Sequence, residues 1–277
     1  MRTLVIGATG KTGRAVTRAL ATRGVDVRAA VRSTAAPDRT RAAGAGSASV
    51  VDLETGAGLA AAVDGMDAVY HLAPNVHPDE VAIARRVATS ARAAGVARFA
   101  FHSVLHPDDA SMPHHTRKAE AEAVVREQNP DALVLRPAAY HQNLVDAARA
   151  GLIAVPYSLD APFTNVDLDD VAEVAAGLLT GTAWAAGTFE LVGPERLSVR
   201  ELAAVATRVL GREVVAERLA VEAWRSGPGA TLPASARADL EAMFATYDRE
   251  GLVGDPTTLA GLLPRPPRTW ADALTAR

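Results

Sequence analysis

The sequence contains no cysteine among its 277 residues. Disulfide bridges, a thiolate nucleophile and cysteine-ligated metals are therefore excluded. No apolar run is long enough to span a bilayer, and we expect no basic-then-apolar leader at the start of the chain. The formal net charge of −3 gives no general attraction to nucleic acid or to an anionic membrane. We therefore expect a cytoplasmic protein that binds neither of them.

Aromatic residues are also scarce, at 4%, although 49% of the residues are hydrophobic. Alanine and valine supply much of that hydrophobic content, which favours an α/β protein with close packing of helices on a sheet. A chain of this length can bury a sizeable core.

Strand-like runs alternate with helix-like runs in the first half, which predicts βαβ units and a mostly parallel sheet. Residues 33–46 are rich in Pro, Ala, Gly and charge, and we expect a surface connection there. Gly24 and Gly95 stand where helix ends favour a left-handed residue. The expected strands are 3–6, 26–31, 48–51, 67–72, 97–102 and 132–136, and the expected helices are 12–23, 56–63, 79–94 and 114–128.

After Pro137 the alternation loosens. Ser198 and Glu201 form a capping-box pattern at the start of a helix. The sequence therefore predicts a mostly parallel sheet in the first half and a smaller C-terminal part built on it. Helices are expected at 167–180, 198–210 and 234–247, and strands at 188–192 and 214–219.

A glycine turn follows the first predicted strand. Leu4, Val5 and Ile6 form an apolar run typical of a buried parallel strand. Glycines at positions 7, 10 and 13 permit a tight turn, close approach to a ligand and close packing of helix on strand. The amides of residues 10–12 would then face a pyrophosphate at a helix N-terminus. The spacing, G-x-x-G-x-x-G, is one residue off the common dinucleotide pattern, and an ordinary strand-to-helix turn is the alternative.

The end of the second predicted strand bears on the choice of cofactor. No carboxylate stands there to bind the ribose of NAD, whereas Arg32 can face the 2′-phosphate of NADP. We therefore expect NADP(H) in preference to NAD(H), with a solvated surface arginine as the alternative. Asp52, after the third strand, can accept from the adenine amino group while Leu53 covers the ring. A loop or helix-cap role for Asp52 is the alternative.

Several separated segments together resemble the NmrA-like type of atypical short-chain dehydrogenase/reductase. The resemblance extends over nearly the whole chain and depends on the order and spacing of these segments. They are residues 7–13 (GATGKTG), 31–32 (VR), 50–53 (VVDL), 67–74 (DAVYHLAP), 136–144 (RPAAYHQNL), 162–167 (PFTNVD), 170–172 (DVA) and 267–269 (PRT).

The resemblance implies a Rossmann-type doubly wound parallel sheet with a small α/β C-terminal substrate-binding part, and NADP as the usual cofactor. Residues 1–150 would form the NAD(P)-binding domain, and residues 151–277 a smaller region interleaved with it. The resemblance places phosphate contacts on Gly7, Thr9, Gly10, Lys11 and Thr12, the 2′-phosphate contact on Arg32, the adenine contact on Asp52, ribose contacts on Leu72, Ala73 and Pro74, and nicotinamide contacts on Pro137 and Ala138.

The wider superfamily reduces carbonyls with a Tyr-x-x-x-Lys pair assisted by a serine. Here the tyrosine position is His114, while Lys118 can still hold the nicotinamide ribose. His114 would be either a proton donor or a helix-start residue with no chemistry. Ser103 lies next to the usual serine position, where our alignment puts Val104. Tyr140 is the other candidate proton donor, with packing of the cleft as the alternative.

These features predict an NADPH-dependent reductase that transfers hydride to a small conjugated acceptor such as a quinone, enone or imine. A non-catalytic NADP(H) sensor of the NmrA type is the alternative, because the proton-donating group is altered. An epimerase or dehydratase that retains NAD is disfavoured by Arg32 and by the missing tyrosine. The histidines show no metal-ligand spacing with a carboxylate, so we expect no metal site. A monomer and a homodimer are both consistent with the sequence.

Overall fold

A computed structural model describes residues 1–33, 37–74 and 76–276 of the chain. Its main element is a seven-stranded sheet with the strand order β3-β2-β1-β4-β5-β6-β8, in which β1 to β6 pair in parallel. The order reverses between β1 and β4, as in a doubly wound Rossmann-type sheet. The predicted fold class is therefore confirmed. The strands are β1 (Arg2–Ile6), β2 (Asp26–Val31), β3 (Ser47–Val50), β4 (Ala68–His71), β5 (Arg98–His102), β6 (Leu133–Pro137) and β8 (Gly187–Leu191).

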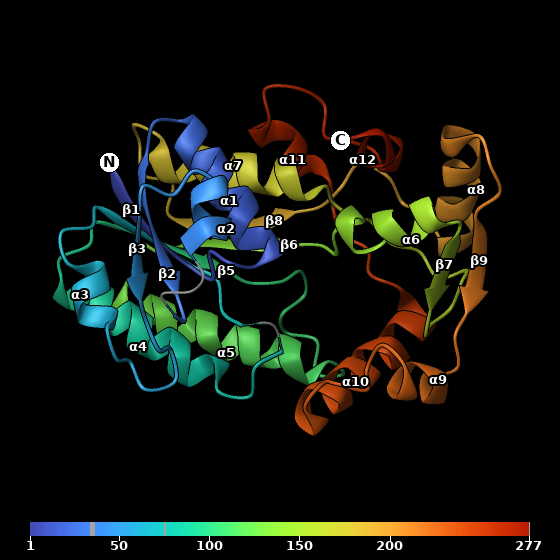
Figure 1. The fold of residues 1–277 in the computed structure, drawn as a ribbon, viewed down its shortest axis with the longest axis horizontal. Coiled ribbons are helices and arrows are strands. Elements are labelled where there is room, and N and C mark those ends of the chain that lie inside the picture. Colours follow the sequence, from blue (N-terminus) through green and yellow to red (C-terminus); the bar gives the residue numbers. More distant parts are fainter. Residues whose placement is uncertain (34–36, 75, 277) are drawn as a thin grey trace. The chain divides into compact units, whose positions relative to one another are not determined.

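Helices cover both faces of this sheet (Figure 1). Helices α1 (Lys11–Thr22), α2 (Pro37–Ala42) and α7 (Leu168–Thr180) lie over one face. Helices α3 (Leu59–Val63), α4 (Glu80–Ala93) and α5 (Pro113–Gln128) lie over the other. A strand that is covered on both faces needs apolar side chains on both, and Leu4, Val5 and Ile6 of β1 are all 0% exposed.

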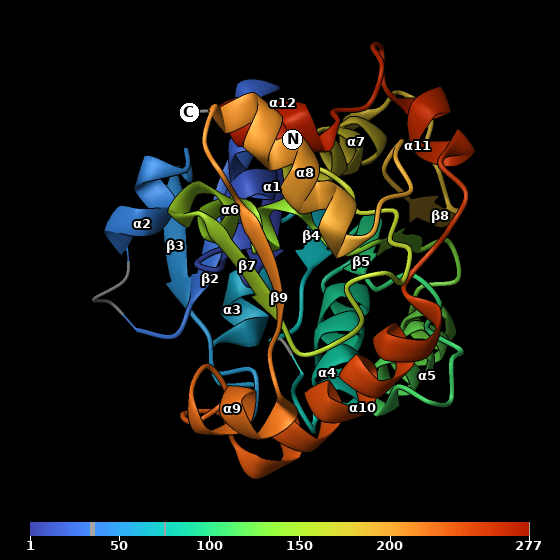
Figure 2. The same cartoon turned by 90° about the vertical axis from the view of Figure 1, so that its right-hand side faces the viewer.

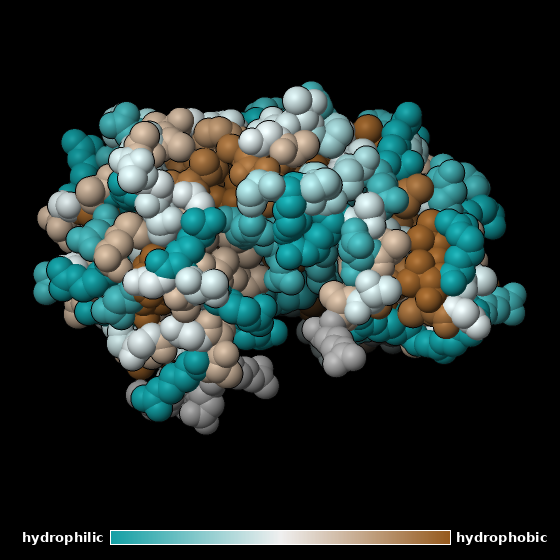
Figure 3. All heavy atoms as spheres, turned by 90° about the horizontal axis from the view of Figure 1, so that it is seen from above, coloured by the Kyte–Doolittle hydropathy of each residue, from teal (hydrophilic) through white to brown (hydrophobic). Residues whose placement is uncertain are grey.

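Close packing of helices on the sheet uses small residues. The core on the α3, α4 and α5 side contains Ile83, Val87 and four alanines from the two helices α3 and α4. Large aromatic side chains are therefore not needed to fill that layer, which agrees with the scarcity of aromatics in the sequence. Figure 3 shows small separate apolar patches among hydrophilic residues on the face that it displays.

The chain forms two compact units, and neither is continuous in sequence. The first, called here the sheet unit, comprises Met1–Asp108, Thr116–Arg136 and Val171–Phe189. The second, called the C-terminal unit, comprises Asp109–His115, Pro137–Asp170 and Glu190–Arg277.

The C-terminal unit has its own two-stranded parallel sheet of β7 (Leu152–Val155) and β9 (Val215–Arg218), seen side by side in Figure 2. Helices α6 (Val145–Ala150) and α8 (Val199–Leu210) pack against β7. Ser198 and Glu201 form the predicted capping box at the start of α8. The remaining elements are η1 (His141–Asn143), α9 (Val221–Ser226), α10 (Ala234–Glu250), α11 (Thr257–Leu262) and α12 (Trp270–Thr275).

Two expectations for the first half were wrong in part. The expected surface connection at 33–46 contains helix α2, which begins at Pro37, a residue favoured at the first helical position; residues 34–36 lie outside the described part. The helix expected from residue 56 begins only at Leu59, because Gly56 and Gly58 have φ values of +82° and +79° that a right-handed helix excludes. Gly24 and Gly95 have φ values of +74° and +70°, as expected.

No helix in the described ranges is both long and apolar enough to cross a membrane.

Candidate functional site

The glycine turn lies at the carboxyl ends of the parallel strands, between β1 and α1. The backbone amide of Gly10 donates to the carbonyl of Gly7 across 3.1 Å, which closes the turn. Gly7 has φ of +77°, and a Cβ there would lie 2.7 Å from the carbonyl oxygen of Leu72, beyond β4. A Cβ on Gly13 would lie 2.1 Å from the carbonyl oxygen of Gly7. Glycine is therefore required at both positions by contacts with backbone.

The first turn of α1 offers backbone amides in the arrangement that binds a pyrophosphate. Gly10 is the N-cap, has extended dihedrals and contributes no side-chain cap. Amides in a first helical turn have no intrahelical carbonyl partner, and the helix dipole makes that end positive. Arg14 donates from Nη1 to the carbonyl of Thr9 at 2.8 Å and so ties the turn to the helix. A turn of this kind can hold a phosphate of a dinucleotide, and that role stays a prediction.

Arg32 directly follows β2, next to β1 in the sheet. Its side chain is exposed, and no described carboxylate forms an ion pair with it. Because β1 and β2 are parallel, their carboxyl ends share one edge of the sheet, and Arg32 stands at the same edge as the glycine turn. This position is suited to a 2′-phosphate, whose geometry matches a guanidinium.

Asp52 lies in the loop after β3, at the same edge. Its Oδ1 accepts from the amides of Glu54 at 2.8 Å and Thr55 at 3.2 Å. Hydrogen bonds from Thr55 and Glu54 hold the pKa of Asp52 below its ordinary value. The structure thus shows the loop role, and the adenine contact stays a prediction. Leu53 is partly buried against the core.

The remaining predicted cofactor residues follow β4 and β6. Leu72 and Pro74 are half-buried and Ala73 is buried, directly after β4 and beside the glycine turn. Pro137 and Ala138 belong to the C-terminal unit, where the amide of Ala138 donates to the carbonyl of Leu191 at 3.0 Å.

Lys118 is held by two groups within the sheet unit. Its Nζ lies 2.5 Å from Oε1 of Glu80 and donates to the backbone carbonyl of His102 at 3.2 Å. Only 1% of the Glu80 side chain and 11% of the Lys118 side chain are exposed. The ammonium also lies over the ring of Phe101, 5.4 Å from its centroid. No local pattern in the sequence marks Glu80 as a site residue, because its pairing with Lys118 depends on how α4 packs beside α5.

Two histidines near Lys118 are neutral at physiological pH. Burial, together with the charge of Lys118, lowers the pKa of both His71 and His102 to about 3. The hydroxyl of Tyr70 and Nδ1 of His102 lie 2.5 Å apart. Neither ring nitrogen of His71 has a hydrogen-bond partner in the described part of the chain, and its ring packs against Phe99 and Phe101.

Ser103 follows β5 and is 1% exposed. Its hydroxyl donates to Oε1 of Glu122 at 2.5 Å. Burial would raise the pKa of Glu122, but hydrogen bonds from Arg136 and Ser103 outweigh burial and keep that pKa below its ordinary value. Arg136 donates to both oxygens of Glu122, at 2.9 and 2.7 Å. In this arrangement the only hydroxyl proton of Ser103 is used within the protein, which disfavours a role in polarising a substrate.

The two candidate proton donors belong to the C-terminal unit. His114, in the first turn of α5, is 8% exposed, and its ring stacks edge-on against His115 with centroids 4.5 Å apart. Tyr140 is half-buried and forms a backbone bridge with Val166. Their chemical roles stay predictions.

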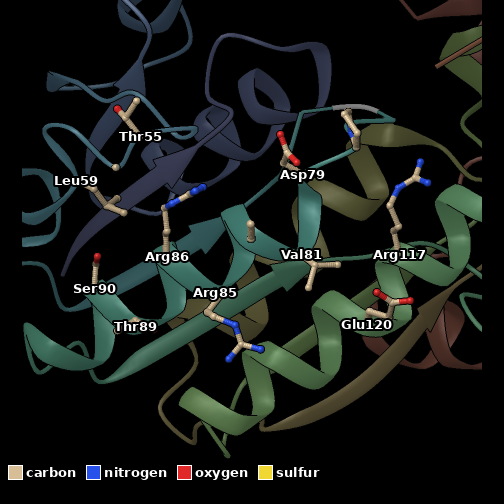
Figure 4. A pocket seen from close by; sticks show the side chains of 13 residues that line it. Thr55, Leu59, Asp79, Val81, Arg85, Arg86, Thr89, Ser90, Arg117 and Glu120 are labelled. Carbon is tan, nitrogen blue, oxygen red and sulfur yellow. The ribbon is translucent and has the colours of Figure 1, made fainter. Parts of the chain in front are cut away.

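A separate pocket of about 920 Å³ lies outside this set of residues. Its lining comes from the loop before α3, from the start and outer face of α4, and from α5 (Figure 4). The lining residues are Thr55, Gly56, Leu59, Pro78, Asp79, Val81, Ala82, Arg85, Arg86, Thr89, Ser90, Arg117 and Glu120. None of the predicted site residues lines it. Within residues 1–33, 37–74 and 76–276, no three His, Asp or Glu side chains are grouped to hold a metal ion.

Comparison with known families agrees with this geometry, because the model of the NmrA-like family matches residues 1–262. The chain belongs to the NmrA-like family. It is 34% identical to a (4-alkanoyl-5-oxo-2,5-dihydrofuran-3-yl)methyl phosphate reductase of Streptomyces griseus, over 97% of this chain and 96% of that protein. It is 28% identical to an NAD(P)H azoreductase of Xenophilus azovorans, over 97% and 95% of the two chains.

Among solved structures, this member of the family is similar to the NADPH-dependent quinone oxidoreductase of Escherichia coli in complex with NADPH. The TM-score is 0.83 at 23% identity, with 99% of this chain and 98% of that chain covered. The predicted NmrA-like, NAD(P)-binding Rossmann fold is therefore confirmed, and homologues across most of the chain are NAD(P)H-dependent oxidoreductases.

Proposed function

We propose that this NmrA-like protein is an NADPH-dependent reductase of small conjugated acceptors such as quinones, enones or imines. The observation that carries the proposal is the alignment of three groups along one edge of the sheet. The glycine turn follows β1, Arg32 follows β2, and Lys118 is bound to the last carbonyl of β5. These groups suit the pyrophosphate, the 2′-phosphate and the nicotinamide ribose of one extended cofactor.

NADPH, when bound, supplies a hydride, and a proton must come from elsewhere to complete the reduction. A conjugated acceptor suits the residues present, since its reduced form can take that proton from solvent or from His114. A simple ketone requires stronger acid assistance, and the superfamily tyrosine is replaced here. Lys118 binds and orients in this proposal and does not act as the proton donor.

The relatives support this substrate class. The name of the Streptomyces relative describes a ring C=C bond next to a ring carbonyl and an alkanoyl carbonyl, which is an enone. The other two relatives are named for azo and quinone reduction. All three names describe redox chemistry on a conjugated group, so an acceptor of this kind is the first to test.

The test follows loss of reduced-nicotinamide absorbance with quinones, enones, imines, azo compounds and simple ketones, with NADPH and NADH in parallel. We expect turnover with NADPH and at least one conjugated class, and little with simple ketones. Turnover of ketones alone would contradict the proposed substrate class.

The preference for NADPH over NADH is tested with a separate variant. Arg32→Ser should raise the KM for NADPH by about tenfold or more while leaving the KM for NADH nearly unchanged, because only NADPH carries the 2′-phosphate. Arg92→Ser is the control, since Arg92 is exposed in the last turn of α4, at the amino edge of the sheet. Equal effects of the two variants would remove Arg32 from the site.

A non-catalytic NADP(H) sensor is the second candidate. The observation that favours it is the bond from Ser103 to Glu122, which engages the hydroxyl next to the usual serine position. A sensor would bind NADPH and release it unoxidised with every acceptor tested.

A further inference from the structure

We propose that Glu80 is the positioning residue for Lys118, an inference that rests on the proposed function. Glu80 has no contact with the glycine turn or with Arg32 among the described residues. It acts only through the ammonium of Lys118, which it holds at the end of β5 where the nicotinamide ribose is expected.

The geometry assigns this role because the ammonium of Lys118 is held on two sides. Its Nζ forms an ion pair with Oε1 of Glu80 at 2.5 Å and donates to the backbone carbonyl of His102 at 3.2 Å. An ammonium has three donors, so donor capacity remains for a ligand once the head group is held in place. A lysine side chain is otherwise flexible, and fixing its head group in advance lowers the entropic cost of binding.

The placement of Glu80 also fits this role. It is the first residue of α4, where the helix dipole favours a carboxylate. Figure 4 shows that Asp79, its chain neighbour, and Arg117, the neighbour of Lys118, lie on the side where α4 and α5 begin. The two helix starts thus bring a buried acid and a buried base together, although 38 positions separate residues 80 and 118.

Burial makes the pair a strong constraint. An ion pair at the surface is screened by water, but Glu80 is 1% exposed and Lys118 is 11% exposed. If Glu80 loses its charge, the ammonium is left buried without a counter-charge, and we expect it to move toward solvent. That movement takes a donor away from the nicotinamide end, while the phosphate end is unaffected.

The experiment compares two ligands that differ at the nicotinamide end. NADPH contains the nicotinamide ribose, whereas adenosine 2′,5′-bisphosphate contains only the adenosine half with its two phosphates. Their dissociation constants are measured by calorimetry for the wild type, Glu80→Gln, Glu80→Asp, Lys118→Met and the double variant Glu80→Gln/Lys118→Met. Glu127→Gln is the matched control, because Glu127 pairs with Arg85 at 3.1 Å on the exposed side of α5.

We expect Glu80→Gln to weaken NADPH binding by about tenfold or more, with adenosine 2′,5′-bisphosphate bound as in the wild type. Glu80→Asp should restore part of the affinity, because it keeps the charge. The double variant should bind NADPH no more weakly than Lys118→Met alone, since Glu80 acts through Lys118. The double variant also removes both buried charges, so it reports on the pair even if Glu80→Gln folds poorly.

Three results would overturn the inference. Glu80→Gln could weaken the binding of both ligands equally, or it could bind NADPH as tightly as the control Glu127→Gln does. The third result is that the effects of the two substitutions on NADPH affinity add up in the double variant. A wild type that does not bind NADPH, or a Lys118→Met variant with unchanged NADPH affinity, would instead overturn the proposed function or the role of Lys118 in it. The two kinds of failure are therefore distinguishable.

Discussion

The contact between α1 and β1 leads to a quantitative prediction for Gly13→Ala. The new Cβ would lie 2.1 Å from the carbonyl oxygen of Gly7 and 2.8 Å from the Cα of Ala8. Both are backbone atoms that cannot rotate away, so the upper end of the usual overpacking cost, about 3 kcal/mol, applies. Alanine is the better helix former by about 1 kcal/mol. The expected net loss is about 2 kcal/mol of unfolding free energy.

The assay is urea denaturation at equilibrium, with NADPH affinity measured on the same samples. Gly261→Ala is the matched control, because Gly261 also lies in a helix, α11, but a Cβ there would meet nothing within 4 Å. The control should gain up to about 1 kcal/mol. Gly13→Ala should also weaken NADPH binding, since separating α1 from β1 moves the first-turn amides. A Gly13→Ala protein as stable as Gly261→Ala, with unchanged NADPH affinity, would refute the reasoning.

Two further predictions concern titration of buried groups. The pKa of His71 is about 3 in the folded protein against 6.5 when unfolded, so the unfolded chain binds the extra proton and stability falls as pH drops below 6.5. His71→Leu should therefore reduce the loss of unfolding free energy between pH 7.5 and pH 5 by about 2 kcal/mol, and an unchanged pH dependence would contradict this. Glu122→Gln should cost about 3 kcal/mol at pH 7, because it leaves the charge of Arg136 uncompensated. The pKa of Glu122 is lowered by folding, so its contribution is present above its unfolded value and lost as the pH falls through the folded value. The difference in unfolding free energy between the wild type and Glu122→Gln, measured by denaturation, should therefore become smaller below pH 4. A difference that stays constant with pH would contradict the pairing of this carboxylate.

Local patterns in the sequence were sufficient to predict the positions of the first six strands along the chain and their mostly parallel arrangement. A parallel strand covered on both faces is an apolar run, as in Leu4 to Ile6, and this pattern depends on few neighbours. The glycine turn could be predicted for the same reason. Its glycines are set by the geometry of one strand, one turn and one helix that are consecutive in the chain.

Elements that depend on distant partners were missed. Strand β7 was not expected from the sequence, whereas its partner β9 corresponds to the strand expected at 214–219. The two strands pair in the register Leu152 to Val215, so β7 depends on a partner far away in the chain. Helix α12 begins at Trp270, which donates from Nε1 to the carbonyl of Leu202, far away in the chain. A four-residue strand or a six-residue helix has little intrinsic stability, and its tertiary contacts decide its structure.

The same distinction between local and distant contacts applies to the candidate site. The sequence by itself determined that Arg32 follows a parallel strand, because parallel strands bring their carboxyl ends to one edge. It also placed His114 and Lys118 four residues apart on one helix. Only the tertiary structure decided their partners. It placed Glu80 on Lys118 and Glu122 on Ser103, because ion pairs and hydrogen bonds between different elements depend on how helices pack. No spacing along the chain records that packing.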